Sequence, residues 1–241
     1  MLKKDYQLIT KKLIRWIKQK VKESNTKGAV IGLSGGIDSS VTSVLCKKAF
    51  PENTLGIIMP CHSNQKDQTD ARLLTDKFSI NNKVINLEKP FEILITSLPD
   101  NKNNRLASAN IKPRLRMTVL YYFANLNNYL VVGTGNRSEL ELGYFTKYGD
   151  GGVDIEPLGN LVKTEVKKIA KLLKIPKKII NKPPSAGLWE NQQDEKEMEL
   201  SYQEIDKYIL TGEGPEDTVE KIEKMIASNK HKLNKPPVPE F

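Results

Sequence analysis

A glycine-rich turn between an apolar run and a helical pattern constrains this chain more than any other feature. The run Ala29–Leu33 is short and wholly apolar, as expected for a strand that is buried on both faces. The residues after it read L-S-G-G-I-D-S-S, and apolar side chains then recur at helical spacing up to Ala49. A strand, a tight turn and a helix N-terminus in this order present free backbone N–H groups and the positive end of a helix dipole. The sequence therefore predicts an anion-binding loop at 32–39.

The polar residues of this turn indicate which anion it binds. Gly35 and Gly36 allow the backbone to approach a ligand where a Cβ would intrude. The hydroxyls of Ser34 and Ser39 can bond to phosphate oxygens or to the helix N-terminus. A carboxylate at Asp38 beside a bound phosphate makes sense when a divalent cation lies between the two. We therefore expect a pyrophosphate site in which Asp38 binds Mg²⁺.

Strand and helix patterns alternate along the rest of the chain. Further buried strands are expected at 55–59, 83–87 and 129–133. Helical patterns cover 3–23, 40–49, 67–78, 107–126, 164–173, 201–209 and 219–226, and the long segments at 99–105 and 179–195 read as loops. The helix at 107–126 is expected to be interrupted at Pro113. This order predicts an α/β fold with a mostly parallel sheet between helices, in a single domain over 1–241.

Charge and cysteine content limit the partners and the compartment. The chain of 241 residues has a net charge of +9, but its lysines are scattered over helix patterns. We attribute most of this excess to solvated faces and expect a nucleotide ligand rather than a nucleic acid. No apolar run reaches the length of a membrane span, and charged residues appear early at the N-terminus, so we expect neither a membrane segment nor a secretory signal. Cys46 and Cys61 make no disulfide framework, which favours a reducing cytoplasm.

Two further polar segments follow the expected strand at 129–133. The first reads G-T-G-N-R-S-E and lies at a strand C-terminus, where open α/β sheets bind ligands; its Glu139 can supply a second carboxylate to the metal. The second, at 145–154, places Lys147, Asp150 and Asp154 on a glycine-hinged loop. Runs of Asp and Gly are also common in plain turns, so for this second segment alone an ordinary turn remains an alternative.

Together these motifs resemble those of the NAD synthetase family of pyrophosphatase-loop ATPases. The turn has neither the common nucleotide P-loop G-x-x-x-x-G-K-[ST] nor the dinucleotide fingerprint G-x-G-x-x-G, whereas S-G-G-x-D-S after a strand is similar to the pyrophosphatase loop. The family patterns F-T-K-[YF]-G-D-G-G-x-D, N-x-K-x-R-x-R-M, P-[TS]-A-[DG]-L and H-K are matched at 145–154, 110–117, 184–188 and 231–232. The similarity covers nearly the whole chain. The chain has no room for the added glutaminase domain of the glutamine-dependent members, so it resembles the ammonia-dependent form.

This resemblance implies a fold and a reaction. The fold would be the adenine nucleotide alpha hydrolase-like fold, with a parallel sheet sandwiched by helices. Members of the family convert deamido-NAD and ATP into an adenylated intermediate and pyrophosphate, and ammonia then displaces AMP to give NAD, in the last step of NAD biosynthesis. The resemblance further implies Mg²⁺ as cofactor and a homodimer.

The same resemblance assigns roles to individual residues. Mg²⁺ would be bound by Asp38 and Glu139, and Asp150 would lie near the ammonia and help to remove its proton. The positions that match ATP contacts are Gly32, Leu33, Ser34, Gly35, Gly36, Ile37, Asp38, Ser39, Thr134, Lys163 and Ser185. The positions that match deamido-NAD contacts are Arg114, Lys147, Asp154, His231 and Lys232, and whether Arg114 or Arg116 touches the substrate stays open.

Two other functions remain alternatives at this point. Another pyrophosphatase-loop enzyme, such as a tRNA-thiolating or GMP-forming ligase, would share the turn, but a thiolating enzyme would want a reactive cysteine pair and an RNA-binding extension, and neither is visible in this sequence. A non-catalytic nucleotide-binding module would have no need for both Asp38 and Glu139.

Overall fold

The core of the protein is a four-stranded sheet in which all strands run parallel. The computed structural model describes residues 4–99, 104–189 and 192–240. The strands follow one another in space as β3 (Asn81–Val84), β2 (Thr54–Ile58), β1 (Gly28–Gly32) and β4 (Tyr129–Val131). The chain moves outward from β1 to β3 on one side and adds β4 on the other, so the strand order reverses between β1 and β4. Open α/β sheets bind ligands at this switch point, beyond the carboxyl ends of the strands.

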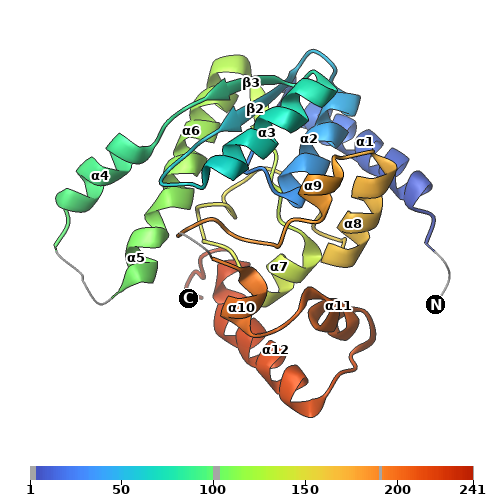
Figure 1. Cartoon of the computed structure of the whole chain (residues 1–241), viewed down its shortest axis with the longest axis vertical. Coiled ribbons are helices and arrows are strands. Elements are labelled where there is room, and N and C mark those ends of the chain that lie inside the picture. Colours follow the sequence, from blue (N-terminus) through green and yellow to red (C-terminus); the bar gives the residue numbers. More distant parts are fainter. Residues whose placement is uncertain (1–3, 100–103, 190–191, 241) are drawn as a thin grey trace.

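Helices cover both faces of the sheet, and each face has its own apolar core. One layer is formed by α1 (Tyr6–Glu23), α2 (Ile37–Ala49), α3 (Gln65–Phe78) and α8 (Lys163–Leu172). The opposite face is covered by α6 (Ile111–Asn127), as Figure 1 shows. Alternate residues of β1 point to the two sides, since Ala29 and Ile31 pack in one core and Val30 in the other. This arrangement explains why the sequence of β1 is apolar throughout.

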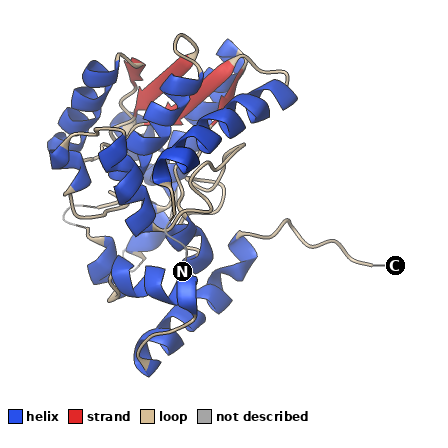
Figure 2. Cartoon of the chain, turned by 90° about the vertical axis from the view of Figure 1, so that its right-hand side faces the viewer, coloured by secondary structure: helices blue, strands red, loops and turns tan. Residues whose placement is uncertain are grey.

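A smaller group of helices lies beneath the carboxyl edge of the sheet. It packs α7 (Arg137–Leu142), α11 (Tyr202–Thr211) and α12 (Glu216–Asn229) around a third apolar cluster (Figure 1). The remaining short elements are α4 (Glu88–Thr96), α5 (Arg105–Ala109), α9 (Lys177–Ile180), α10 (Asp194–Met198) and the 3-10 helix η1 (Lys230–Lys232). The tail after η1 extends away from the body of the molecule (Figure 2).

The predicted α/β fold with a parallel sheet between helices is confirmed, but the expected break at Pro113 is wrong. The chain is interrupted at Asn110 instead, between α5 and α6. Pro113 lies in the first turn of α6, where the N–H that proline lacks would have no partner within the helix. The helix that carries Arg114 and Arg116 is therefore continuous.

Other boundaries differ from the sequence prediction for local reasons. Helix α2 begins at Ile37, ahead of the serines where we expected its start, so Asp38 lies in the first helical turn. Strand β3 begins two residues earlier than predicted and is exposed along its length, as an edge strand can be. The predicted loop at 179–195 contains α9 and α10 at its ends, and the predicted loop at 99–105 falls mostly outside the described residues. Among the described residues, no helix combines the length and apolarity that crossing a bilayer requires.

Candidate active site

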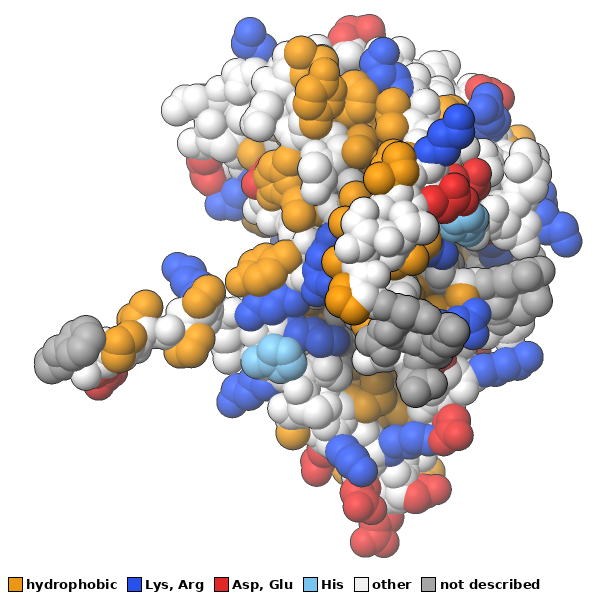
Figure 3. All heavy atoms as spheres, turned by 90° about the vertical axis from the view of Figure 1, so that its left-hand side faces the viewer, with side chains coloured by type: hydrophobic (Ala, Val, Ile, Leu, Met, Phe, Trp, Pro, Cys, Tyr) orange, Lys and Arg blue, Asp and Glu red, His pale blue; other side chains and the backbone are white. Residues whose placement is uncertain are grey.

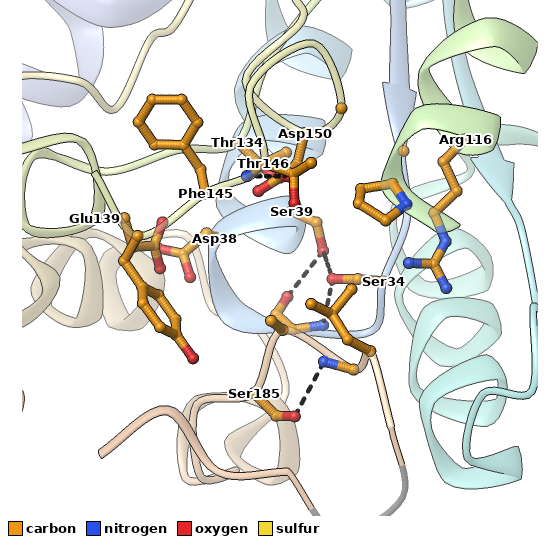
Figure 4. Close-up of a pocket in the computed structure, with 18 of the residues that line it drawn as sticks. Ser34, Asp38, Ser39, Arg116, Thr134, Glu139, Phe145, Thr146, Asp150 and Ser185 are labelled. Atoms are coloured by element: carbon orange, nitrogen blue, oxygen red, sulfur yellow. Dashed lines mark hydrogen bonds between the residues drawn. The ribbon is translucent and has the colours of Figure 1, made fainter. Parts of the chain in front are cut away.

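The turn between β1 and α2 forms a compact loop at the carboxyl edge of the sheet. Gly35 has φ +72°, and a Cβ at this position would lie 2.2 Å from the carbonyl oxygen of Asp67, so both conformation and space require glycine. The Ser34 hydroxyl accepts from the N–H of Gly36 at 3.2 Å and lies 3.0 Å from the Ser39 hydroxyl, as Figure 4 shows. These bonds fix the loop with the start of α2 directed at the cavity. The N–H groups of the first turn are then available to an anion.

Two carboxylates converge on one ammonium group beside this loop. Lys163 Nζ lies 2.6 Å from Asp38 Oδ2 and 2.9 Å from Glu139 Oε1, and its side chain is 3% exposed. Figure 4 shows the carboxylates of Asp38 and Glu139 facing each other. Burial alone would lower the pKa of Lys163, but the two carboxylates outweigh it and raise that pKa. Burial also raises the pKa of Glu139, against the charge of Lys163. The two carboxylates therefore share one buried positive charge.

Glu139 is held in place by a helix cap that the sequence prediction overlooked. Asn136 and Glu139 form a capping box at the start of α7: the Asn136 side chain accepts from the N–H of Glu139 at 3.1 Å, and Glu139 Oε2 accepts from the N–H of Asn136 at 3.2 Å. The amide of Asn136 also donates to Asp38 Oδ1 at 3.0 Å. One oxygen of each carboxylate is thus fixed by Asn136, and the other faces Lys163. The sequence signal for this helix start was the spacing N-x-x-E, with Glu139 three residues after Asn136.

The carboxylates suit a hard divalent cation. Among the described residues, no group of three or more His, Cys, Asp or Glu side chains converges as a complete metal site. Asp38 and Glu139 offer two oxygen donors next to an anion-binding loop, and a cationic group already lies between them. Mg²⁺ commonly takes one or two protein carboxylates and completes its shell with phosphate oxygens and water. The residues present therefore fit a Mg²⁺ ion that binds together with a nucleotide.

A cavity of about 540 Å³ joins this site to the rest of the carboxyl edge. It is lined by every predicted site residue except Gly35 and Asp154. The lining residues that we predicted from sequence are Gly32, Leu33, Ser34, Gly36, Ile37, Asp38, Ser39, Arg114, Thr134, Glu139, Lys147, Asp150, Lys163, Ser185, His231 and Lys232. Their individual roles stay predictions, but the structure brings them to one cavity from stretches that are far apart in the sequence.

Cations line the end of the cavity that lies away from the phosphate loop. Lys232 Nζ donates to the carbonyls of Gly143 and Phe145, at 2.7 and 3.1 Å, and Lys147 Nζ donates to the carbonyl of His231 at 2.7 Å. The guanidinium of Arg114 donates to the carbonyl of Lys147 at 3.3 Å. Figure 3 shows lysine and arginine side chains gathered where this face is hollowed, between the body and the lower helices. Their acceptors are neutral carbonyls, which do not cancel the charge of these side chains, although burial lowers the pKa of Lys232.

Asp150 lies between the two ends of the cavity. Its carboxylate accepts from the N–H of Thr146 at 2.9 Å (Figure 4). Asp150 is exposed to the open cavity, but the protein around its carboxylate partly desolvates it, which raises the pKa of Asp150. The N–H of Thr146 and the charge of Arg116 oppose that rise. A carboxylate with a raised pKa is better suited to accept a proton than an ordinary one.

Asp154 is placed differently from the other predicted residues. Its carboxylate accepts from the N–H of Val131, at the end of β4, at 2.8 Å and from the hydroxyl of Tyr121 at 3.0 Å. Through Asp154, the two bonds together link β4 to α6. Asp154 does not line the cavity. A role in deamido-NAD binding stays a prediction for this residue. Arg116, which does line the cavity, donates to the carbonyl of Met59 at 3.2 Å and so braces the segment after β2.

Two polar residues that we did not predict hold the loop beside the cavity: Asp194, which lines the cavity, and Lys112, which does not. Asp194 accepts from the N–H of Ala186 at 2.9 Å and from the Tyr202 hydroxyl at 3.3 Å, which connects the P-S-A-G-L loop to the helices below. Lys112 holds the same loop from the other side, by donating to the carbonyl of Leu188 at 2.7 Å. These contacts join segments far apart in sequence, so no local pattern signals them.

Known proteins resemble this chain over its whole length. The family model described as NAD synthase matches residues 9–236. The NH(3)-dependent NAD(+) synthetase of Carboxydothermus hydrogenoformans is 54% identical over 233 residues, which is 95% of this chain and 96% of that protein. The structure of NMN synthetase from Francisella tularensis matches with a TM-score of 0.94 at 35% identity, covering 99% of this chain and 100% of that one. The NH3-dependent NAD synthetase from Campylobacter jejuni matches with a TM-score of 0.82 at 33% identity, covering 98% and 100%. On these similarities and on the geometry of its cavity, the chain belongs to the NAD synthase family.

Proposed function

We propose that this chain catalyses the ATP-dependent amidation of deamido-NAD by ammonia, with NAD, AMP and pyrophosphate as products. The observation that carries the proposal is the single cavity at the β1–β4 edge, which joins a phosphate loop with two carboxylates to a cation-lined end. An adenylating enzyme needs both parts, because ATP and a second nucleotide must meet at one point. Close relatives of this chain are NH(3)-dependent NAD(+) synthetases, which supports the same reaction.

In the first step the acceptor carboxylate attacks the α-phosphorus of ATP, and pyrophosphate leaves. The loop at 32–39 binds the phosphates through its N–H groups and hydroxyls, and Thr134, Lys163 and Ser185 contact the nucleotide. Asp38 and Glu139 would hold Mg²⁺, which would neutralise the charge that develops on the leaving pyrophosphate.

Deamido-NAD occupies the cationic end of the cavity. Its pyrophosphate suits Arg114, Lys147, His231 and Lys232, which border the cavity, and three of these side chains carry charges without a carboxylate partner in the described residues. The nicotinate carboxylate then points toward the phosphate loop. This orientation brings the nucleophile to the α-phosphate.

In the second step ammonia attacks the acyl carbon of the adenylate, and AMP leaves. Ammonia is largely ammonium at neutral pH, so a carboxylate can attract the cation and take up its proton before attack. Asp150 lies between the two ends of the cavity and has a raised pKa, which supports this role.

A second acceptor is favoured by one structural comparison. The solved chain with a TM-score of 0.94 is an NMN synthetase. The acid that corresponds to NMN is nicotinate mononucleotide, which lacks the adenylate half of deamido-NAD. This smaller acceptor would use the same carboxylate chemistry but fewer of the cations.

A homodimer in the cytoplasm completes the proposal. Large apolar side chains are exposed on α4, α5 and α6, among them Ile93, Leu106, Tyr122 and Leu126. Exposed apolar surface of this extent supports contact with a second copy. Both cysteines are buried and free, which suits a reducing compartment.

One assay tests the reaction and distinguishes the acceptors. Purified protein is incubated with ATP, Mg²⁺, an ammonium salt and either deamido-NAD or nicotinate mononucleotide, and NAD, NMN, AMP and pyrophosphate are quantified. We expect NAD with a higher kcat/KM than NMN, and no product when glutamine replaces ammonium. Formation of neither amide would rule out the proposed function, and a preference for the mononucleotide would favour the second acceptor.

A further inference from the structure

The ammonium of Lys163 lies at the position where a bound metal ion would contact the protein. Its Nζ bridges Asp38 Oδ2 and Glu139 Oε1 at 2.6 and 2.9 Å. These are the two oxygens that the capping amide and backbone of Asn136 leave open, because Asn136 bonds to the other oxygen of each carboxylate. A cation that uses both carboxylates must therefore use the oxygens that Lys163 now holds.

Among the described residues, Asp38 and Glu139 favour the Lys163 ammonium most strongly, and the Asp194 carboxylate and the Tyr202 ring favour it less. Lys163 is the first residue of α8, where the helix dipole disfavours a positive charge. Its neighbour below is the ring of Tyr202, with the ring centre 4.7 Å from Nζ. A buried ammonium that loses its carboxylates is strongly destabilised unless another anion replaces them. The position of Nζ therefore depends on Asp38 and Glu139 being free of metal.

The reverse dependence holds for the carboxylates. The side chains of Asp38 and Glu139 are only 15% and 18% exposed, so water screens their repulsion poorly. Without a cation between them, the two negative charges would repel each other. A positive charge is thus required at this position whether or not a metal is present.

We propose that Lys163 is an internal counter-ion that occupies the Mg²⁺ position until a metal–nucleotide complex arrives, and that its ammonium then moves to the phosphates. This inference rests on the proposed adenylating function, since it assigns the metal to Asp38 and Glu139. The exchange conserves charge pairing at each stage: the metal replaces the ammonium on the carboxylates, and the incoming phosphates replace the carboxylates on the ammonium. A free divalent cation brings no anion for the displaced lysine, so it binds poorly by itself. The site thereby favours Mg²⁺ that comes with a nucleotide.

The proposal is tested by measuring Mn²⁺ binding to the full-length protein without nucleotide, by electron paramagnetic resonance. Lys163→Met removes the competing charge and keeps most of the stem, so Mn²⁺ should bind at least about tenfold more tightly than to the wild type. Lys163→Arg keeps a charge and should bind Mn²⁺ as weakly as the wild type. Lys147→Met removes one charge from the same cavity without touching a carboxylate, and should change Mn²⁺ affinity less than about threefold. Equal Mn²⁺ affinity in Lys163→Met and wild type, or a similar gain in Lys147→Met, would overturn the proposal.

A second measurement on the wild type covers the case in which Lys163→Met does not fold. Crystal structures are compared without ligand and with Mn²⁺ and a non-hydrolysable ATP analogue. We expect Nζ to leave both carboxylates and to contact a phosphate oxygen in the second structure. A metal ion bound to Asp38 and Glu139 while Nζ stays within hydrogen-bond distance of both would contradict the exchange. Neither measurement uses deamido-NAD, so failure of the exchange is distinct from failure of the proposed reaction.

Discussion

Positively charged side chains have different hydrogen-bond partners at the two ends of the cavity. At the phosphate-loop end, Lys163 is buried and shared by two carboxylates, at 2.6 and 2.9 Å. At the other end, Lys147 and Lys232 donate to backbone carbonyls, each at 2.7 Å, and His231 is exposed. A carbonyl fixes the direction of a lysine but does not cancel its charge. The charges at the first end are therefore paired, so one cation can replace another there. The positive charges at the second end are not paired, so they attract an anionic ligand.

This difference predicts different responses to substitution. Charges at the buried end depend on one another, so removal of one leaves its partners unpaired and costs stability. Loss of a carboxylate also weakens metal binding, whereas loss of Lys163 strengthens it. Charges at the exposed end act on the ligand almost independently, so removal of one weakens binding of the acceptor and little else.

The largest effect is expected for Asp38→Asn. This change removes a proposed metal ligand and half of the charge that pairs with Lys163. Because electrostatic stabilisation of the leaving pyrophosphate depends on this site, its release should slow at least about 10³-fold. Steady-state pyrophosphate release at saturating Mg²⁺ measures the effect. Asp76→Asn, on the exposed side of α3, is the matched control and should behave as wild type. A loss below roughly tenfold would show that Asp38 does not bind the metal.

The next effect separates the two chemical steps. Asp150→Asn keeps a group that can accept the N–H bond from Thr146 but cannot take up a proton. Formation of the amide should slow about 100-fold, while formation of the adenylate changes by less than about threefold. Rapid quench experiments would then show a normal burst of pyrophosphate and a slow appearance of NAD. An equal decrease in both steps would make Asp150 a positioning residue.

A smaller effect is expected at the exposed end. Lys232→Met removes one charge that lines the acceptor side of the cavity. The KM for deamido-NAD should rise about tenfold, while the KM for ATP stays unchanged. Lys230→Met is the control, because Lys230 is an exposed neighbour on η1 that does not line the cavity. If ATP binding weakened equally, the two ends of the cavity would not bind their ligands independently.

The sequence predicts those parts of the site that depend on local geometry. The loop of Gly35 and Gly36 follows from a strand, a glycine turn and a helix start within about a dozen residues, and each signal is local. The start of helix α7 could also have been predicted from the sequence, because Asn136 and Glu139 have the spacing of a capping box. The predicted break at Pro113 was wrong because proline disrupts a helix interior but not its first turn.

Contacts between distant segments could not be predicted from residues alone. Lys163 and Asp38 are 125 positions apart in the sequence, and no local sequence pattern around either residue indicates their contact. Asp154 lies in the same glycine-rich segment as Asp150, yet only Asp150 faces the cavity, because Asp154 is used to tie β4 to α6. Motif similarity groups such residues together, whereas tertiary packing decides which of them reach the ligand.

The last prediction concerns stability rather than activity, at a third carboxylate behind the buried end. Glu156 packs against the loop after β4, where a Cβ at Gly133 would lie 2.4 Å from its Cδ, and its Oε2 is buried without a hydrogen-bond partner among the described residues. Burial raises the pKa of Glu156 to about 8, and the charge of Glu139 adds to the rise. At neutral pH this side chain is therefore mostly uncharged. The buried end thus carries the charges of Asp38, Glu139 and Lys163 without a further negative one.

The pH dependence of stability tests this charge count. An acid whose pKa is higher in the folded protein than in the unfolded chain keeps its proton longer when folded, so its ionisation reduces stability as pH rises, until the pH exceeds the folded pKa. Because the pKa of Glu156 rises from its ordinary 4.5 to about 8, the wild type should lose up to roughly 5 kcal/mol of unfolding free energy relative to Glu156→Gln between about pH 4.5 and about pH 8. Urea denaturation at several pH values measures the difference. Glu213→Gln, in the exposed loop after α11, should show no such slope. Parallel pH profiles for wild type and Glu156→Gln would mean that Glu156 is ionised in the folded protein. In that case the buried end would carry a second net negative charge, and the difference in net charge between the two ends of the cavity would be larger.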